Sequence, residues 1–224
     1  MKRRWRLRQA EGQSLVEMAL ALPVLLLMFV GLIEIGAALR NYLIVVNADR
    51  EGTRFAAHGR WFDSTEDVQE IFKWVEAAAG VEQRGGDLVP FLRTVPVGDL
   101  ADNTTIAIHY IEVPAQWDEG GGEDPQAPRI YGPWYTGTLH YGDTRIDAAA
   151  IAEKARAENY AFNKRYFVDE GLLDIPSEDN FVIIEVWYEH EQWLKLPIFT
   201  ELLPEKFTLY AHSQMRVTLD SRIE

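Results

Sequence analysis

Residues 12–59, GQSLVEMALALPVLLLMFVGLIEIGAALRNYLIVVNADREGTRFAAHG, decide how the rest of the chain is organised. Within this stretch, residues 15–39 are apolar except for two acids, Glu17 and Glu34. At about 1.5 Å per residue, a helix of that length spans roughly 37 Å, which exceeds the hydrocarbon core of a bilayer at about 30 Å. The sequence therefore predicts a membrane-crossing helix over residues 15–39.

A basic cluster precedes the apolar run. Residues 1–12 carry five basic side chains and one acid, whereas the whole chain of 224 residues has a net charge of −13. Positive charge on the cytoplasmic side orients a membrane helix, so we expect a single-pass protein of the cytoplasmic membrane with its N-terminus in the cytoplasm. The acidic remainder would lie outside that membrane. Because it would repel phosphate backbones, we exclude nucleic acid as a partner.

The apolar run differs from a removable secretory signal. The apolar part of a signal peptide covers only about 7–15 residues and ends at a cleavage site of small residues. Here the run is longer, and it ends in the sequence EIGAALR at residues 34–40. We therefore expect the helix to stay in the mature protein.

The acid at the start of the run has two interpretations. A carboxylate at the edge of a membrane helix is costly unless it is paired or close to water. Glu17 can be an interfacial acid that the dipole of the helix N-terminus favours. Its position offers the other interpretation, because Glu17 is the fifth residue after Gly12 and a short basic segment precedes that glycine. This order resembles the leader of a type IV prepilin.

The resemblance extends beyond the leader. The first 60 residues resemble the TadE/TadG-like pseudopilin family of tight-adherence (Tad/Flp) pilus assembly systems. Residues 48–57, ADREGTRFAA, are similar to a second block of that family, and Met18 stands where the family usually has an aromatic residue. The residues that carry the first block are Gly12, Val16, Glu17, Ala19, Leu20, Leu22, Pro23, Gly31, Ile33, Glu34 and Gly36.

The resemblance implies a structural role in pilus assembly. A prepilin peptidase would cut after Gly12, and Gln13 would become the mature N-terminus. Glu17 would then pair with the N-terminal amine of a neighbouring subunit, and the desolvated charges would fix the register of assembly. The implied partners are other pilin or pseudopilin subunits, the pilus assembly machinery, the prepilin peptidase and the lipid bilayer.

Three segments are expected along the chain. Residues 1–12 would be a basic leader, residues 13–60 a transmembrane helix that continues as the spine of the outer part, and residues 61–224 an extracytoplasmic α+β domain. On the spine, small and apolar residues recur at helical spacing, and the charged residues, Asp49 among them, fall mostly on other faces. The recurring residues are Val45, Ala48, Gly52, Phe55, Ala56 and Gly59.

Hydrophobic periodicity predicts further elements of a pilin-like domain. A helix with a capping box at Ser64 is expected to end at Gly80, and another to cover residues 147–167. Alternation of apolar residues predicts strands at residues 104–113, 181–194 and 206–219, in a small antiparallel sheet. Residues 80–103 are expected to be rich in loops.

An alternative function is suggested by residues 115–145. This stretch holds six glycines, three prolines and the aromatic residues Trp117, Tyr131, Trp134, Tyr135 and Tyr141. The aromatic side chains can form a lid on the core, or they can be an exposed patch that contacts a partner. The second interpretation would make the chain a single-pass membrane receptor or binding module.

No motif for catalysis, cofactor binding or metal binding is present in the sequence. The chain has no cysteine, which excludes disulfides and thiolate chemistry. His190 and Glu191 lack the second histidine of a zinc-protease helix, and the acidic residues 118–124 lack the spacing of a calcium loop. His109 and His212 are expected to be satisfied groups at the edge of the core. We therefore expect no enzyme activity, no cofactor and no metal site.

Overall fold

The computed structural model of the chain describes residues 3–58, 65–78, 81–84, 87–90, 104–117, 122–123, 126–136, 144–173, 177–192 and 204–217. The chain forms two compact units. One unit comprises Met1–Asn41 and Glu191–Lys206, and the other comprises Tyr42–His190 and Phe207–Glu224. The first contains the apolar part of the N-terminal helix, and the second contains an α+β domain.

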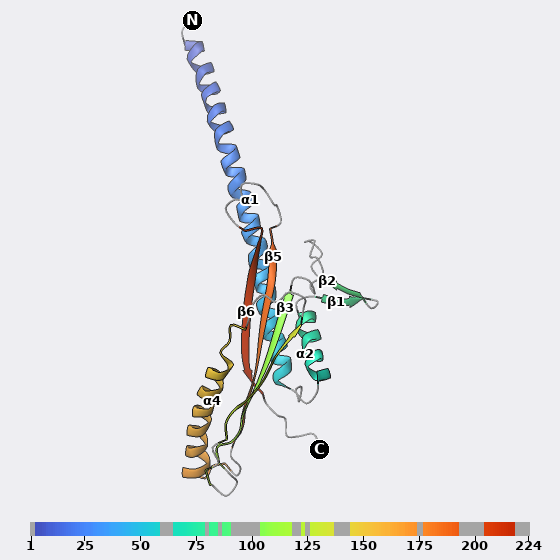
Figure 1. Cartoon of the computed structure of the whole chain (residues 1–224). Helices are drawn as coiled ribbons and strands as arrows, with labels where there is room; N and C mark the ends of the chain where they lie inside the picture. Colours follow the sequence, from blue (N-terminus) through green and yellow to red (C-terminus); the bar gives the residue numbers. More distant parts are fainter. Residues whose placement is uncertain are drawn as a thin grey trace. The chain divides into compact units, whose positions relative to one another are not determined.

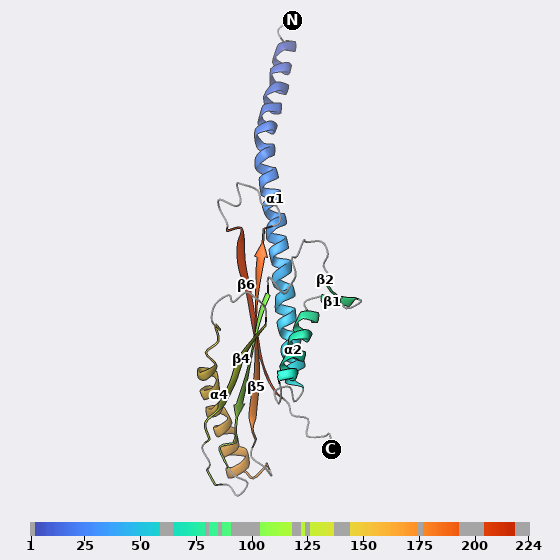
Figure 2. The ribbon, with the colours of Figure 1, turned by 45° about the vertical axis from the view of Figure 1, so that its right-hand side comes forward.

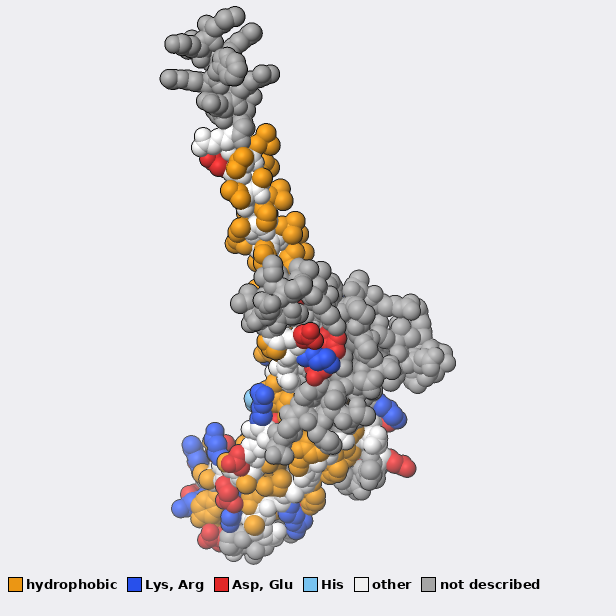
Figure 3. Space-filling view, turned by 45° about the horizontal axis from the view of Figure 1, so that its top comes forward, with side chains coloured by type: hydrophobic (Ala, Val, Ile, Leu, Met, Phe, Trp, Pro, Cys, Tyr) orange, Lys and Arg blue, Asp and Glu red, His pale blue; other side chains and the backbone are white. Residues whose placement is uncertain are grey.

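Helix α1 runs from Arg3 to Ala57. It covers both the predicted membrane segment and the predicted spine, and it tolerates Pro23 in its interior. By length and composition, its portion Gln13–Ala57 is able to contain a membrane span. Its apolar stretch over residues 15–39 matches the predicted one, and hydrophobic side chains cover the described N-terminal part of this helix (Figure 3).

A four-stranded antiparallel sheet forms the centre of the domain, in the order β4-β3-β5-β6. The strands are β3 (Thr104–Val113), β4 (Arg129–Thr136), β5 (Asp179–Glu191) and β6 (Lys206–Arg216). Strand β3 pairs with both β4 and β5, and Ile108 lies opposite Ile184 in β5. The amide of Gln192 donates to the carbonyl of Glu205 and the amide of Val217 donates to that of Asn180, so β6 runs antiparallel to β5.

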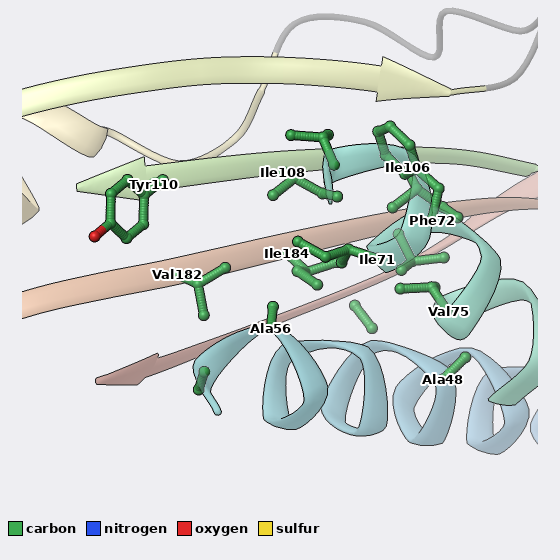
Figure 4. Packing of buried hydrophobic residues seen from close by; sticks show 14 of the residues in the cluster. Ala48, Ala56, Ile71, Phe72, Val75, Ile106, Ile108, Tyr110, Val182 and Ile184 are labelled. Carbon is green, nitrogen blue, oxygen red and sulfur yellow. The ribbon is translucent and has the colours of Figure 1, made fainter. Parts of the chain in front are cut away.

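One face of the sheet packs against the outer part of α1 and against α2 (Thr65–Ala78) (Figure 1). Alternate residues of β3 and β5 point to this face. Ile106, Ile108 and Tyr110 of β3 are among them, and the alternation of their sequence predicts that they share a face. Figure 4 shows the packing of Ala48 and Ala56 of α1 with Ile71, Phe72 and Val75 of α2 and with the strand residues Val182 and Ile184. This is the larger of the two hydrophobic cores.

Gly52 allows α1 and α2 to approach closely. A β-carbon at this position would collide with the side chain of Val75. Gly52 is itself buried. The small-residue stripe of the spine therefore contacts α2 as well as the sheet.

The opposite face of the sheet is covered by α4 (Ala148–Asn163), as Figure 2 shows. The carboxylate of Asp147 caps this helix by accepting a hydrogen bond of 3.0 Å from the amide of Ala150. A π-helical turn, η1 (Lys164–Asp169), follows it. The second core contains Ile111, Val113, Ala152, Ala155, Phe181 and Ile183. Strands β3 and β5 are therefore buried on both faces.

The connection from η1 to β5 is held on α4 by side-chain amides. Asn159 and Asn163 both donate to the carbonyl of Ser177, at 2.9 Å and 2.8 Å, and the amide of Ser177 donates to Asn163 Oδ1 at 2.7 Å. Asn163 also donates to Asn159 Oδ1 at 2.9 Å. Both asparagines are buried. We call Asn159, Asn163 and Ser177 the asparagine clasp.

The α+β class and the small antiparallel sheet are confirmed. Within the region predicted to be rich in loops, residues 80–103, β1 (Val81–Arg84) and β2 (Asp87–Pro90) pair as a hairpin that was not predicted. A Gly-Gly pair separates the two strands in the sequence, and such a pair is a hairpin signal that outweighs the polar composition around it. The segment limits 1–12, 13–60 and 61–224 remain predictions.

Candidate functional site on helix α1 and its support in the sheet

The predicted processing bond, between Gly12 and Gln13, lies inside α1. The side-chain amide of Gln13 donates a hydrogen bond of 3.1 Å to Glu17 Oε1. The two residues are four positions apart and therefore neighbours on one face of the helix. Within a single chain, the Glu17 carboxylate thus already has a polar partner at the edge of the apolar run.

The apolar residues that follow Glu17 present their side chains outward. Leu20 is 71% exposed and Leu32 is 67% exposed, and similar values hold for most large side chains between them. A soluble protein rarely exposes so many contiguous apolar side chains. This part of α1 is suited to contact with lipid or with other apolar helices.

Glu34 lies in a different environment from Glu17. The place of Glu34 near the outer end of the apolar run allowed two expectations, solvation or pairing with Arg40. Glu34 is only 8% exposed, so it is not solvated. Glu34 precedes the buried Val45 by about three helical turns, so both residues fall on the same face of α1.

Residues 12–54 match the family model described as TadE-like protein. This segment is TadE-like. The match includes Gly12, Gln13 and Glu17, and it confirms the resemblance found in the sequence. No curated protein and no solved structure matches the chain.

The similarity to TadE-like proteins, which belong to Tad pilus systems, is a property of residues 12–54. The TadE-like family is a family of structural pilus components and not of enzymes. The segment contains the whole apolar part of α1 and most of the spine. The rest of the chain, which includes every strand of the sheet, lies outside the match.

A buried polar cluster supports the sheet on the side of α4, and we call it the Glu185 cluster. Glu185 on β5 is fully buried. Its Oε2 lies 2.9 Å from His109 Nε2 on β3 and also accepts from the hydroxyl of Thr144. Its Oε1 accepts from the hydroxyl of Tyr210 on β6 at 2.7 Å and from the amide of Arg145 at 3.0 Å. One carboxylate therefore links three strands to the entrance of α4.

The surroundings of Glu185 favour its ionised form. Burial alone would raise its pKa, but the four hydrogen bonds outweigh burial and lower the pKa of the Glu185 carboxyl. The same contact acts on Tyr210 in the other direction. Burial and the hydrogen bond to Glu185 raise the pKa of the Tyr210 hydroxyl. The guanidinium of Arg145 lies over the Tyr210 ring, 4.6 Å from its centroid.

A second buried acid lies on the other face of the sheet, outside the predicted membrane segment. Asp49 of α1 is 1% exposed, and Thr53 of the same helix is fully buried. The sequence had indicated that Asp49 falls on an exposed face of the spine. This prediction is wrong, because the residue is buried. Its backbone carbonyl accepts hydrogen bonds from Thr53 Oγ1 at 2.8 Å and from Ser213 Oγ of β6 at 3.1 Å.

The Asp49 carboxyl is poorly satisfied. Its Oδ1 is buried without a hydrogen-bond partner. Among the residues that the structure describes, no lysine or arginine forms an ion pair with it. Burial raises the pKa of Asp49 to about 7, although the hydroxyl and amide of Ser213 and the charge of Arg50 oppose this shift.

The aromatic stretch at residues 115–145 is in part regular structure. Tyr131 and Tyr135 lie on the edge strand β4 and are 38% and 37% exposed. Trp134 packs against the larger core, and Trp117 contacts the ring of Tyr160 at 5.4 Å. Tyr141 lies outside the described residues. These positions do not favour the receptor interpretation, because the two described tryptophans contribute to the packing of the domain and do not form an exposed patch with the two tyrosines.

Among the described residues, the histidines and acids form no metal site. In the described part of the chain, no group of three or more His, Asp or Glu side chains is able to hold a metal ion. His109 belongs to the Glu185 cluster, and His190 packs against Phe207. His212 stacks on Tyr210 but is exposed, which differs from the core-edge position expected for it. Most of the acidic run 118–124 lies outside the described residues.

Sequence reasoning did not identify Glu185 or Asp49. A signal for Glu185 was present in the sequence, because it interrupts the strand FVIIEVWY with an acid between Ile184 and Val186. An acid inside an otherwise apolar strand is buried only when partners satisfy it. The partners of both acids come from remote segments, and periodicity does not predict those.

Proposed function

We propose that this chain is a pseudopilin-like structural subunit of a Tad/Flp-type pilus biogenesis system, and that a prepilin peptidase cuts it after Gly12. In this role the apolar half of α1 packs beside other pilin or pseudopilin helices in the cytoplasmic membrane. The α+β domain lies outside that membrane. The subunit acts by assembling and not by catalysing a reaction.

The observation that carries the proposal is the TadE-like segment, with an acid five residues after Gly12 and an exposed apolar helix beyond it. Most large apolar side chains of this part of α1 are exposed, which suits contact with lipid and with neighbouring helices. The basic leader favours a cytoplasmic N-terminus.

Glu17 is the residue to which we assign the assembly contact. In the single chain it accepts a hydrogen bond from the uncharged side chain of Gln13 at 3.1 Å. After the proposed cut, Gln13 would carry a charged α-amine, and the amine of a neighbouring subunit would be a stronger partner for the carboxylate than an amide. The exchange of one partner for the other would fix the register between subunits.

The test is replacement of Glu17. A hydrogen bond to a charged group contributes about 1.5–3 kcal/mol, and about 1.4 kcal/mol corresponds to tenfold in an equilibrium. We therefore expect Glu17→Gln to reduce the number of assembled pili at least about tenfold, while membrane insertion stays at the wild-type level. Pili would be counted by electron microscopy, and insertion would be measured by extraction of the membrane fraction.

A matched control is Glu51→Gln, which neutralises an exposed acid on the same helix. This variant should assemble as the wild type does. Normal piliation by Glu17→Gln would contradict the assembly role of the acid.

A further inference from the structure

The contact between the outer part of α1 and the edge strand β6 is made through a small polar cluster, which we call the Asp49 seam. It consists of Asp49, Thr53 and Ser213. The hydroxyl oxygens of Thr53 and Ser213 are 2.5 Å apart, and both hydroxyls reach the carbonyl of Asp49. Apolar side chains of the larger core surround them. These are Val45, Ala48 and Ala56 of α1, Ala211 of β6, and Val217, which follows β6.

The ionised form of the Asp49 carboxyl is poorly stabilised by this buried environment. Its Oδ1 has no hydrogen-bond partner, and the side chain has no ion-pair partner among the described residues. A buried carboxylate without a cation is costly, whereas the protonated acid is neutral and can donate a hydrogen bond. Protonation therefore removes the largest unfavourable interaction of the seam.

Among the described residues, no neighbouring charged group neutralises the Asp49 carboxylate as a bound proton would. Arg50 is on the same helix and is exposed. Glu185 on β5 carries a like charge and favours the protonated form of Asp49, and Tyr210 on β6 is neutral under ordinary conditions. On α2, Lys73 and Glu70 pair with each other at the surface.

We propose that the Asp49 carboxyl is a proton-binding site that controls how tightly the outer part of α1 is held against strand β6. With the proton bound, the seam is neutral and closed. Without it, the buried charge favours separation of the helix from the strand or entry of water. This property belongs to the domain itself and does not depend on the pilus role proposed above.

The direction of the pH dependence follows from linkage. Burial raises the pKa of Asp49 from its ordinary value of 3.8 to about 7 in the closed seam. A group whose pKa is raised on closing stabilises the closed state fully below its open-state pKa, and that stability is lost as the pH rises through the closed-state pKa. The opening constant should thus rise about tenfold per pH unit between about pH 5 and pH 7, and it should level off above pH 7.

Hydrogen–deuterium exchange of the full chain in detergent micelles tests this inference. Exchange rates of peptides from α1 around Asp49 and from β6 around Ser213 would be divided by the intrinsic rates at each pH. We expect the rise of about tenfold per pH unit in the wild type and a constant value for Asp49→Asn, which keeps the shape but has no proton to lose. Glu51→Gln, on the exposed side of the same helix, should keep the wild-type rise.

Two results would overturn the proposal. One is a wild-type opening constant that does not change between about pH 5 and pH 7, which requires no variant and so does not depend on whether Asp49→Asn folds. The other is an Asp49→Asn protein that shows the same rise as the wild type.

Discussion

His109 on β3 and Glu185 on β5 lie side by side in the interior of the sheet, with 2.9 Å between His109 Nε2 and Glu185 Oε2. Their exposed fractions are 1% and 0%. The same carboxylate accepts from Tyr210 and from the chain that leads into α4. The position of α4 on the sheet therefore depends on one acid in the middle of an apolar strand.

Removal of the carboxylate should destabilise the domain. Glu185→Ala leaves the buried His109 and the half-buried Tyr210 without their acceptor, and each such loss costs about 1–3 kcal/mol. We expect a decrease of about 3–5 kcal/mol in the free energy of unfolding, measured by urea denaturation of the full chain in micelles. Glu153→Ala, an exposed acid on α4, should change it by less than about 0.5 kcal/mol. Equal effects of the two substitutions would show that the Glu185 cluster is not structural.

Glu185 should also determine the acid limit of the domain. The pKa of its carboxyl is lowered in the folded state. Its stabilising contribution is therefore present above the ordinary pKa of a glutamate, 4.5, and is lost as the pH falls through the folded-state pKa. When the pH is lowered below about 4.5, we expect the melting temperature of the wild type to decrease. The decrease should be smaller in Glu185→Gln. Parallel pH profiles for the two proteins would contradict this role.

Gly52 should tolerate no side chain. A β-carbon there meets the side chain of Val75, so Gly52→Ala has to move α2 away from α1. Overpacking of this kind costs about 1–3 kcal/mol, measured as a decrease in the free energy of unfolding. Gly36→Ala is the matched control, because nothing lies within 4 Å of the position of the added carbon. It should leave stability unchanged or slightly raise it, since alanine favours a helix.

The asparagine clasp should stabilise the connection from η1 to β5. Asn163→Ala removes two donated hydrogen bonds and leaves the amide of Ser177 without its acceptor. We expect a loss of about 2–3 kcal/mol, detected by thermal denaturation. Asn47→Ala, at an exposed site of α1, is the control and should have little effect. A clasp that contributes nothing would give the same melting temperature in both variants.

The long elements of the fold could be predicted because their cause is local. Apolar length alone predicts the membrane part of α1, and two-residue alternation predicts β3 with its bounds at Thr104 and Val113. Strand β5 begins two residues earlier than expected and ends at Glu191, and β6 ends at Arg216. Such differences concern ends, where hydrogen bonding to neighbours and not the pattern decides.

The polar interior could not be predicted, because its causes are remote in the sequence. Asp49 is followed by Arg50 and Glu51, and an acid among charged residues of a helix is predicted to be solvent-exposed. It is buried because Ser213, far along the chain, supplies a hydroxyl on the facing strand. Glu185 is buried for the same kind of reason, since its donors lie on two other strands and a connecting segment.

The central claim concerns the start of α1, where the TadE-like segment begins at residue 12. Mass spectrometry of the N-terminal peptide, from protein extracted from the membranes of its native host, tests that claim most directly. We predict that the mature chain begins at Gln13, with the basic leader removed and Glu17 at the fifth position. A mature chain that still begins at Met1 or Lys2 would contradict the proposed processing, and with it the pseudopilin role.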